Sequence, residues 1–137
     1  MTAATPSRST PVLYVDAIEP SLEFWRDRLG FRVDVEVPHG DALGFVILRH
    51  GAVEVMLQTT ASLAADAPEY AQRHNGDKTF LFIEVDDIDA IARSLDGCDV
   101  VLPRRTTFYG ATEIGYREPG GHYATFAQIA RAPEAAG

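Results

Sequence analysis

The sequence predicts an α+β protein made of two copies of one strand–helix–strand–strand–strand unit. The first observation is a repeat: Val15-Asp16-Ala17-Ile18-Glu19 matches Val85-Asp86-Asp87-Ile88-Asp89 seventy positions later. The second is that each half ends in a strand, a glycine-containing reversal and another strand, at 43–58 and at 109–128. Two such units must pack on each other, or on a partner chain, to cover their sheets.

Length and composition narrow the class of protein. The 137 residues suit a single domain overall, and 46% hydrophobic with 23% charged residues is ordinary globular composition. No apolar run approaches the roughly 20 residues of a membrane helix, so we expect a cytoplasmic protein without a membrane partner. The net charge of −8 disfavours a nucleic-acid partner and favours a cationic small molecule. The single cysteine, Cys98, has no partner for an internal disulfide.

The first module is expected at residues 10–58, after a flexible arm at 1–9. Its opening strand places Leu13 and Val15 on one face and Val12 and Tyr14 on the other. A helix of about three turns follows and ends at Gly30; its apolar residues recur at spacings of three and four, at Leu22, Trp25 and Leu29. A strand at 31–37 and the hairpin at 43–58 complete the module.

The second module is expected at residues 79–130, after a linker at 59–78 that contains a short helix. A strand at 80–85 leads into a helix opened by Asp86-Asp87, with Ile88, Ile91 and Leu95 on one face. Gly97 ends this helix, a strand at 99–102 follows, and the hairpin at 109–128 closes the module. Residues 131–137 form a C-terminal tail.

Every strand has one cleanly apolar face, which we expect to meet the helices. The opposite faces together carry apolar and aromatic side chains with a few polar groups, which is typical of a small-molecule pocket. These candidate ligand-binding residues are Tyr14, Glu54, Met56, Gln58, Phe80, Phe82, Glu84, Tyr123 and Thr125, with Val12 beside them. A carboxylate among aromatic rings would attract a cation. The alternative is that these side chains simply fill the concavity that the two modules form, or a dimer interface.

Three strings in the right order resemble the vicinal oxygen chelate superfamily, which includes glyoxalase I, extradiol dioxygenases and the bleomycin resistance proteins. They are VDAIEPSLEFWRDRLGF, VDDIDAIARSL and YGATEIGYREPGGHYATFAQ, the last with Glu118 where the family usually has Asp. The resemblance covers about residues 10–130. It implies curved mixed sheets that form a cup with the helices on the outer face, closed within one chain or by two swapped chains.

The same resemblance implies where metal-using members hold their metal: His or Gln opens the first strand of a module, and Glu lies in its last strand. Here those positions are Thr10, Phe80, Glu54 and Thr125, and one carboxylate does not hold a catalytic metal. We therefore expect no metal and no cofactor. The histidines fall in or beside turns, and His122 is expected to make a structural hydrogen bond; they are His39, His50, His74 and His122.

These residues favour a binding protein over an enzyme. The resemblance implies a homodimer of the bleomycin-resistance kind that sequesters a planar apolar or cationic antibiotic or metabolite without metal. The alternative is a metal-dependent lyase, isomerase or oxygenase, and metal-free catalysis with Glu54 or Glu84 as general base stays open. A regulatory domain is a third possibility if the cup is filled by its own side chains. The identity of the ligand stays open.

Overall fold

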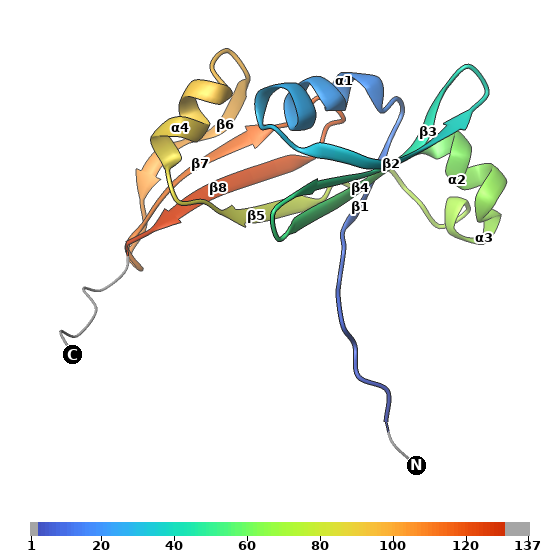
Figure 1. Cartoon of the computed structure of the whole chain (residues 1–137), viewed down its shortest axis with the longest axis horizontal. Coiled ribbons are helices and arrows are strands. Elements are labelled where there is room, and N and C mark those ends of the chain that lie inside the picture. The colour runs from blue at the N-terminus through green and yellow to red at the C-terminus, as the bar shows by residue number, and fades with distance from the viewer. Residues whose placement is uncertain (1–2, 131–137) are drawn as a thin grey trace.

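Two four-stranded mixed sheets, each with a helix on one face, make up the protein (Figure 1). This is a computed structural model, and it describes residues 3–130. The strand order is β1-β4-β3-β2 in the first sheet and β5-β8-β7-β6 in the second. The expected α+β class and the βαβββ order of each half are confirmed, and the two sheets are curved but not closed.

The first half runs from β1 to β4. Its elements are β1 (Val12–Val15), α1 (Glu19–Leu22), the π-helical turn η1 (Glu23–Arg28), β2 (Arg32–His39), β3 (Ala42–His50) and β4 (Val53–Thr59). The connection holds α2 (Thr60–Asp66) and α3 (Pro68–Ala71), where one short helix was expected. Thr59 caps α2, because its hydroxyl accepts the Ser62 N–H at 3.1 Å.

The second half repeats this order. Its elements are β5 (Phe80–Glu84), α4 (Ile88–Ser94), β6 (Asp99–Thr106), β7 (Ala111–Arg117) and β8 (Tyr123–Ile129). Asp87 caps α4 by accepting the Ala90 N–H at 3.1 Å. Residues 131–137, expected as a tail, lie outside the described residues, and residues 3–9 are exposed and hold no helix or strand. Between residues 3 and 130, no helix is long and apolar enough to cross a bilayer.

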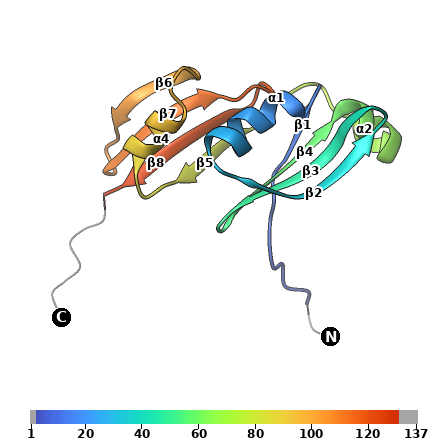
Figure 2. The ribbon, with the colours of Figure 1, turned by 45° about the horizontal axis from the view of Figure 1, so that its top comes forward.

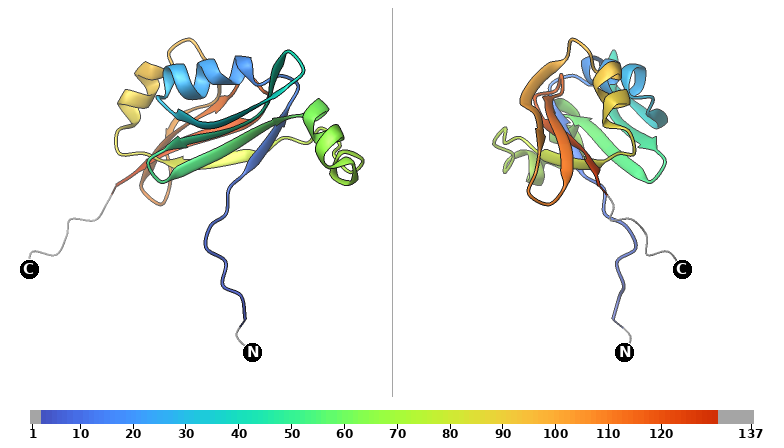
Figure 3. Two further views of the ribbon diagram at one scale, coloured as in Figure 1. Left: turned by 45° about the vertical axis from the view of Figure 1, so that its right-hand side comes forward. Right: turned by 90° about the vertical axis from the view of Figure 1, so that its left-hand side faces the viewer.

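Register decides which side chains meet the helices. In the first sheet β1 is parallel to β4, so Leu13 faces the helices together with its partner Leu57, and both are buried. In the second sheet β5 is parallel to β8, and Ile83 and Phe126 are buried in the same way. Both α1 and α4 lie on the same side of the two sheets (Figures 2 and 3). The expected helix-facing pattern is therefore confirmed.

The first helix departs from the expected regular pattern. After one α-turn it widens into a π-turn, in which the Leu29 N–H bonds the Phe24 carbonyl five residues earlier at 3.2 Å. The wider turn brings the neighbours Phe24 and Trp25 into the core together, with rings 5.1 Å apart. Simple three- and four-residue spacing identifies Trp25 but misses Phe24.

The two edge strands are longer than the sequence indicates. From the sequence these strands are expected to end at Val37 and Leu102, whereas in the structure β2 continues to His39 and β6 to Thr106. Both extensions run through a proline, Pro38 or Pro103, at a place where the strand pairing shifts register. Edge strands tolerate proline at such irregularities because the missing N–H faces away from the sheet.

Hydrogen bonds from the turn between β7 and β8 join the two halves. His122 accepts the Thr79 N–H on Nδ1 at 2.9 Å, so its Nε2–H is the donor to the Tyr14 carbonyl at 2.8 Å. The Trp25 indole donates to Glu118 at 3.3 Å, and the second Glu118 oxygen accepts the His122 N–H at 3.1 Å. The turn that carries Glu118 and His122 therefore fixes the second sheet against β1 and η1, and His122 has its expected structural bonds.

Candidate functional site

The face of the first sheet that points away from the helices is called here the first open face. Cross-strand pairs define it, because directly paired residues project to the same side. The pairs include Arg49 with Glu54, Ile47 with Met56 and Phe45 with Gln58. The sequence-based set from this sheet, Tyr14, Glu54, Met56 and Gln58, lies on this face, as the β1–β4 register requires.

Glu54 lies at one end of this face and is already bonded. Its Oε1 accepts the Thr10 hydroxyl at 2.6 Å, and its Oε2 accepts Arg8 at 3.0 Å and also Arg49. The Thr10 hydrogen bond chiefly lowers the pKa of Glu54, the nearby charges of Arg49 and Arg8 add to the effect, and burial opposes it. Glu54 therefore stays ionised at neutral pH and holds two arginines.

A second carboxylate completes this charged group. The register shift between Val33 and Val35 leaves Asp34 without a cross-strand partner. Asp34 accepts hydrogen bonds from Arg32 and, at 2.9 Å, from Arg49. Hydrogen bonding from Arg32 is the main cause of its lowered pKa. We call the five residues the arginine cluster: Arg8, Arg32, Asp34, Arg49 and Glu54.

Apolar side chains continue the first open face beyond the cluster. Met56 and Ile47 pair across β3 and β4, Val35 pairs with Ile47, and Val12 pairs with Met56. Val35 is 41% exposed, which is high for a valine in a sheet. These four residues form an apolar belt: Val12, Val35, Ile47 and Met56.

A cavity of about 470 Å³ closes the far end of the same face. It lies between the β2–β3 hairpin and α2, and its polar members include His39, Gln58, Ser62 and Asp66. The Gln58 amide donates to the Ser62 hydroxyl at 3.2 Å. One strip of β4 thus runs from the arginine cluster through the apolar belt to a polar cavity, over the four residues that separate Glu54 from Gln58, or about 13 Å.

The equivalent surface of the second sheet, the second open face, is aromatic. Phe80 pairs with Tyr123 and Phe82 with Thr125 across β5 and β8. The Phe80 and Tyr123 rings are stacked, with centroids 4.8 Å apart and planes 14° apart. Phe80 is 76% exposed and Phe82 is 52% exposed. We call Phe80, Phe82 and Tyr123 the aromatic ladder; it presents ring faces to the outside.

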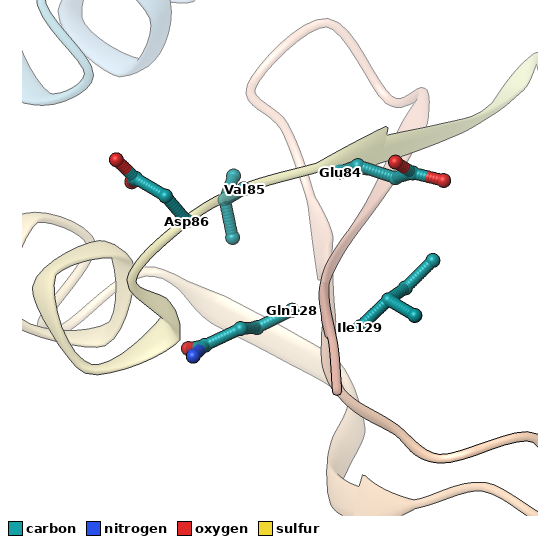
Figure 4. A pocket seen from close by; sticks show the side chains of 5 residues that line it. All are labelled: Glu84, Val85, Asp86, Gln128 and Ile129. Atoms are coloured by element: carbon teal, nitrogen blue, oxygen red, sulfur yellow. The ribbon is translucent and has the colours of Figure 1, made fainter. Parts of the chain in front are cut away.

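Glu84 continues β5 on the same side as Phe82 and opens onto two cavities. One, of about 480 Å³, is lined by Glu84, Val85, Asp86, Gln128 and Ile129 (Figure 4). Figure 4 shows Glu84 and Ile129 on one side of this cavity, and Asp86 and Gln128 on the other. The other, of about 350 Å³, adds first-sheet residues such as His50 and Val53. This end of the second open face is acidic.

The carboxylate of Glu113, by contrast, is already engaged by neighbouring side chains. Glu113 is 2% exposed, and its carboxylate accepts Arg105 at 2.7 Å and the Tyr109 hydroxyl at 3.2 Å. The arginine comes from β6, which pairs Arg105 with Glu113 across the strands.

The nine residues predicted from sequence divide between the two open faces. Tyr14, Glu54, Met56 and Gln58 lie on the first, and Phe80, Phe82, Glu84, Tyr123 and Thr125 on the second. None of the cavities described above is lined by members of both sets. Sequence reasoning missed the β2 and β3 contribution, although the alternation of Phe45, Ile47 and Arg49 with buried Val46 and Leu48 carries that signal.

The four positions that the resemblance marks for a metal do not fit one. Glu54 is engaged by Thr10 and two arginines, Phe80 stacks on Tyr123, and Thr125 offers only a hydroxyl. The strand pairing also makes Met56, rather than Glu54, the counterpart of Thr125. Tyr14 and Glu84 are equivalent in the repeat; Tyr14 pairs with Gln58 and Glu84 with Ala127, and Met56 and Thr125 each lie two residues before those partners. Within residues 3–130, no three His, Cys, Asp or Glu side chains are grouped to hold a metal ion.

Two βαβββ units whose curved sheets leave one face open define the fold, and comparison with known families identifies the class of protein. The model of the Glyoxalase/Bleomycin resistance protein/Dioxygenase superfamily matches residues 9–126. The chain belongs to this superfamily. A search of curated protein sequences gives no significant match.

Solved structures agree on the fold. A glyoxalase/bleomycin resistance protein/dioxygenase from Nocardioides has a TM-score of 0.71 at 17% identity, covering 99% of this chain and 93% of its own. Lactoylglutathione lyase from Agrobacterium tumefaciens has 0.72 at 18%, covering 90% and 95%. The bleomycin-binding protein of bleomycin-producing Streptomyces verticillus, complexed with copper(II)-bleomycin, has 0.62 at 23%, covering 94% and 100%. Such low identities establish a shared fold only.

Proposed function

We propose that this protein sequesters a planar apolar or cationic small molecule, such as an antibiotic or metabolite, without a bound metal ion. The observation that carries the proposal is the aromatic ladder on the second open face. Phe80 at 76% and Phe82 at 52% exposure leave large apolar surfaces in water. Stacking a flat ligand on them would bury that surface, and full burial of one such side chain stabilises by about 1.5–3 kcal/mol.

A positive charge on the ligand fits the end of the ladder. Glu84 lies two residues beyond Phe82 on β5, on the same side of the sheet, and is exposed. Asp86 lines the same cavity. A carboxylate beside aromatic faces stabilises a bound cation, and the chain's net charge of −8 attracts cations from a distance.

A second copy of the chain would complete the site. Each open face would supply one wall, because the sheets of one chain are curved but not closed. In a homodimer in the cytoplasm, the first open face of one copy could cover the aromatic ladder of the other. The solved bleomycin-binding relative, which holds copper(II)-bleomycin, supports a ligand of the antibiotic class for this proposal.

Calorimetry on metal-stripped protein tests the proposal. The panel contains proflavine as a planar cation, naphthol as a planar neutral compound, spermidine as a flexible cation, and bleomycin. We expect the planar compounds to bind and spermidine not to bind. Phe82→Ala should weaken binding by about tenfold, because it removes a stacking surface. Tyr70→Ala, at another exposed aromatic residue on α3, should bind like the wild type.

Two results would count against the proposal. One is failure of every planar compound to bind. The other is binding that appears only after a divalent metal is restored, which would favour the metal-dependent enzyme instead. Light scattering on the same samples should give twice the chain mass of 15.0 kDa, and a mass of one chain would remove the homodimer.

A further inference from the structure

The function proposed above is carried by the aromatic ladder of the second sheet, and it assigns no role to the arginine cluster on the first open face. We infer that the first open face is a site for an organic anion, with its carboxylate or sulfonate group at Arg8 and Arg49 and its apolar body on the apolar belt. This inference goes beyond the proposed function and does not depend on the aromatic ladder.

The charge of the cluster is the first reason. Three guanidinium groups face two carboxylates, Asp34 and Glu54, which leaves one positive charge in a protein of net charge −8. Arg49 bridges both carboxylates and is 35% exposed, so it is fixed in place and still reachable. An arginine held in advance loses less conformational entropy when it binds an anion.

Unused donors are the second reason. A guanidinium group has five N–H donors. Arg49 uses Nε for Asp34 and Nη2 for Glu54, and Arg8 uses Nη1 for Glu54. In the part of the chain that the structure describes, Arg49 Nη1 and Arg8 Nη2 make no hydrogen bond. Both arginines donate to the same oxygen of Glu54, Oε2, so their remaining donors can serve one oxyanion. Hydrogen bonds between charged groups are stronger than those between neutral groups.

The apolar belt indicates that the anionic group is carried by an apolar body. Ile47 and Met56 lie two residues along the strands from Arg49 and Glu54, about 6.6 Å away on the same face. Val35 is 41% exposed beside them. An inorganic anion would leave this apolar surface in water, whereas an aryl or alkyl carboxylate would cover it. The same arrangement disfavours a cation at Glu54, because that carboxylate is surrounded by donors.

A matched pair of fluorescent probes tests the inference. Anilinonaphthalene sulfonate and its parent amine, phenylnaphthylamine, share the aromatic skeleton and differ in the sulfonate. We expect the affinity for the sulfonate to exceed that for the amine by about tenfold or more, since charge-assisted hydrogen bonds add to the same apolar contact. Arg49→Gln should abolish this preference and leave binding of the amine unchanged. Arg104→Gln removes another exposed, ion-paired arginine and should keep the preference.

The readout also has to identify the face and guard against misfolding. The ¹³C-methyl signal of Met56 should shift with the sulfonate in the wild type. Circular dichroism checks that each variant is folded. If Arg49→Gln does not fold, Arg8→Gln replaces it, because Arg8 is 61% exposed outside the sheet, and should weaken only the sulfonate, by about threefold or more. Equal affinities for the two probes, or a full preference in a folded arginine variant, would overturn the inference.

Discussion

Glu54 illustrates what a single residue does in this site. From sequence it is an isolated carboxylate in an apolar strand, and therefore a candidate partner for a cation. In the structure its two oxygens accept bonds from Thr10, Arg8 and Arg49. Its role in our account is to hold arginines in place on the first open face. The β3 strand supplies Arg49 directly opposite it, and this partner decides the chemistry.

The lowered pKa of Glu54 gives a pH-dependent prediction. A carboxylate whose folded pKa is depressed stabilises the fold above its unfolded pKa of about 4.3, and this contribution is lost as pH falls through the lower folded pKa. Thr10→Val removes the largest cause of the depression. The pKa of Glu54 should therefore rise toward its ordinary value, as followed by the ¹³C signal of its carboxyl carbon during acid titration.

A matched control separates this effect from a general loss of a threonine. Thr106→Val changes an exposed threonine on β6 and should leave the Glu54 titration unchanged. An identical Glu54 titration in Thr10→Val and the wild type would show that the hydroxyl does not stabilise the carboxylate.

At the scale of elements, the turn between β7 and β8 is more than a reversal. Glu118 lies in this turn, and its carboxylate accepts the hydrogen bond from the indole of Trp25 on η1. His122 follows four residues later and bonds β1. Gly120 is packed so closely that a Cβ there would lie 2.5 Å from a Val15 methyl carbon. This turn connects the two halves of the protein.

Shortening Glu118 tests this connection. Glu118→Asp should withdraw the carboxylate from Trp25 and leave a buried indole N–H without a partner, which costs about 1–3 kcal/mol. Urea unfolding measures the loss of stability. Glu69→Asp, the same change at an exposed position on α3, should have little effect. If Glu118→Asp is as stable as the wild type, the Trp25 bond does not hold the halves together.

At the scale of the whole molecule, the sequence was sufficient for the order of the elements and the facing of the strands. The repeat gave the βαβββ order, and the alternation of Leu13 and Val15 with Val12 and Tyr14 gave the correct faces. The π-turn at Phe24, the edge strands through Pro38 and Pro103, and the bulge at Asp34 were not predictable from periodicity. They are breaks in regular spacing, which a fixed period of residues does not describe.

The site was predictable only in part for the same reason. The alternation of each strand assigns residues such as Met56 and Phe82 to an open face. It does not tell which neighbours lie across from them, so the pairing of Arg49 with Glu54 and the stacking of Phe80 on Tyr123 emerge only from strand register. Closure of the two open faces into one cup is a further step that the proposed homodimer would supply.

The most direct test of the central claim, that both open faces enclose one planar ligand, uses the methionines. The chain has two, Met1 and Met56, and Met56 lies in the apolar belt of the first open face. Proflavine stacked on the aromatic ladder of a closed cup should shift the ¹³C-methyl signal of Met56 through its ring current, in step with calorimetric saturation. A Met56 signal that stays unchanged while proflavine saturates the protein would contradict the claim.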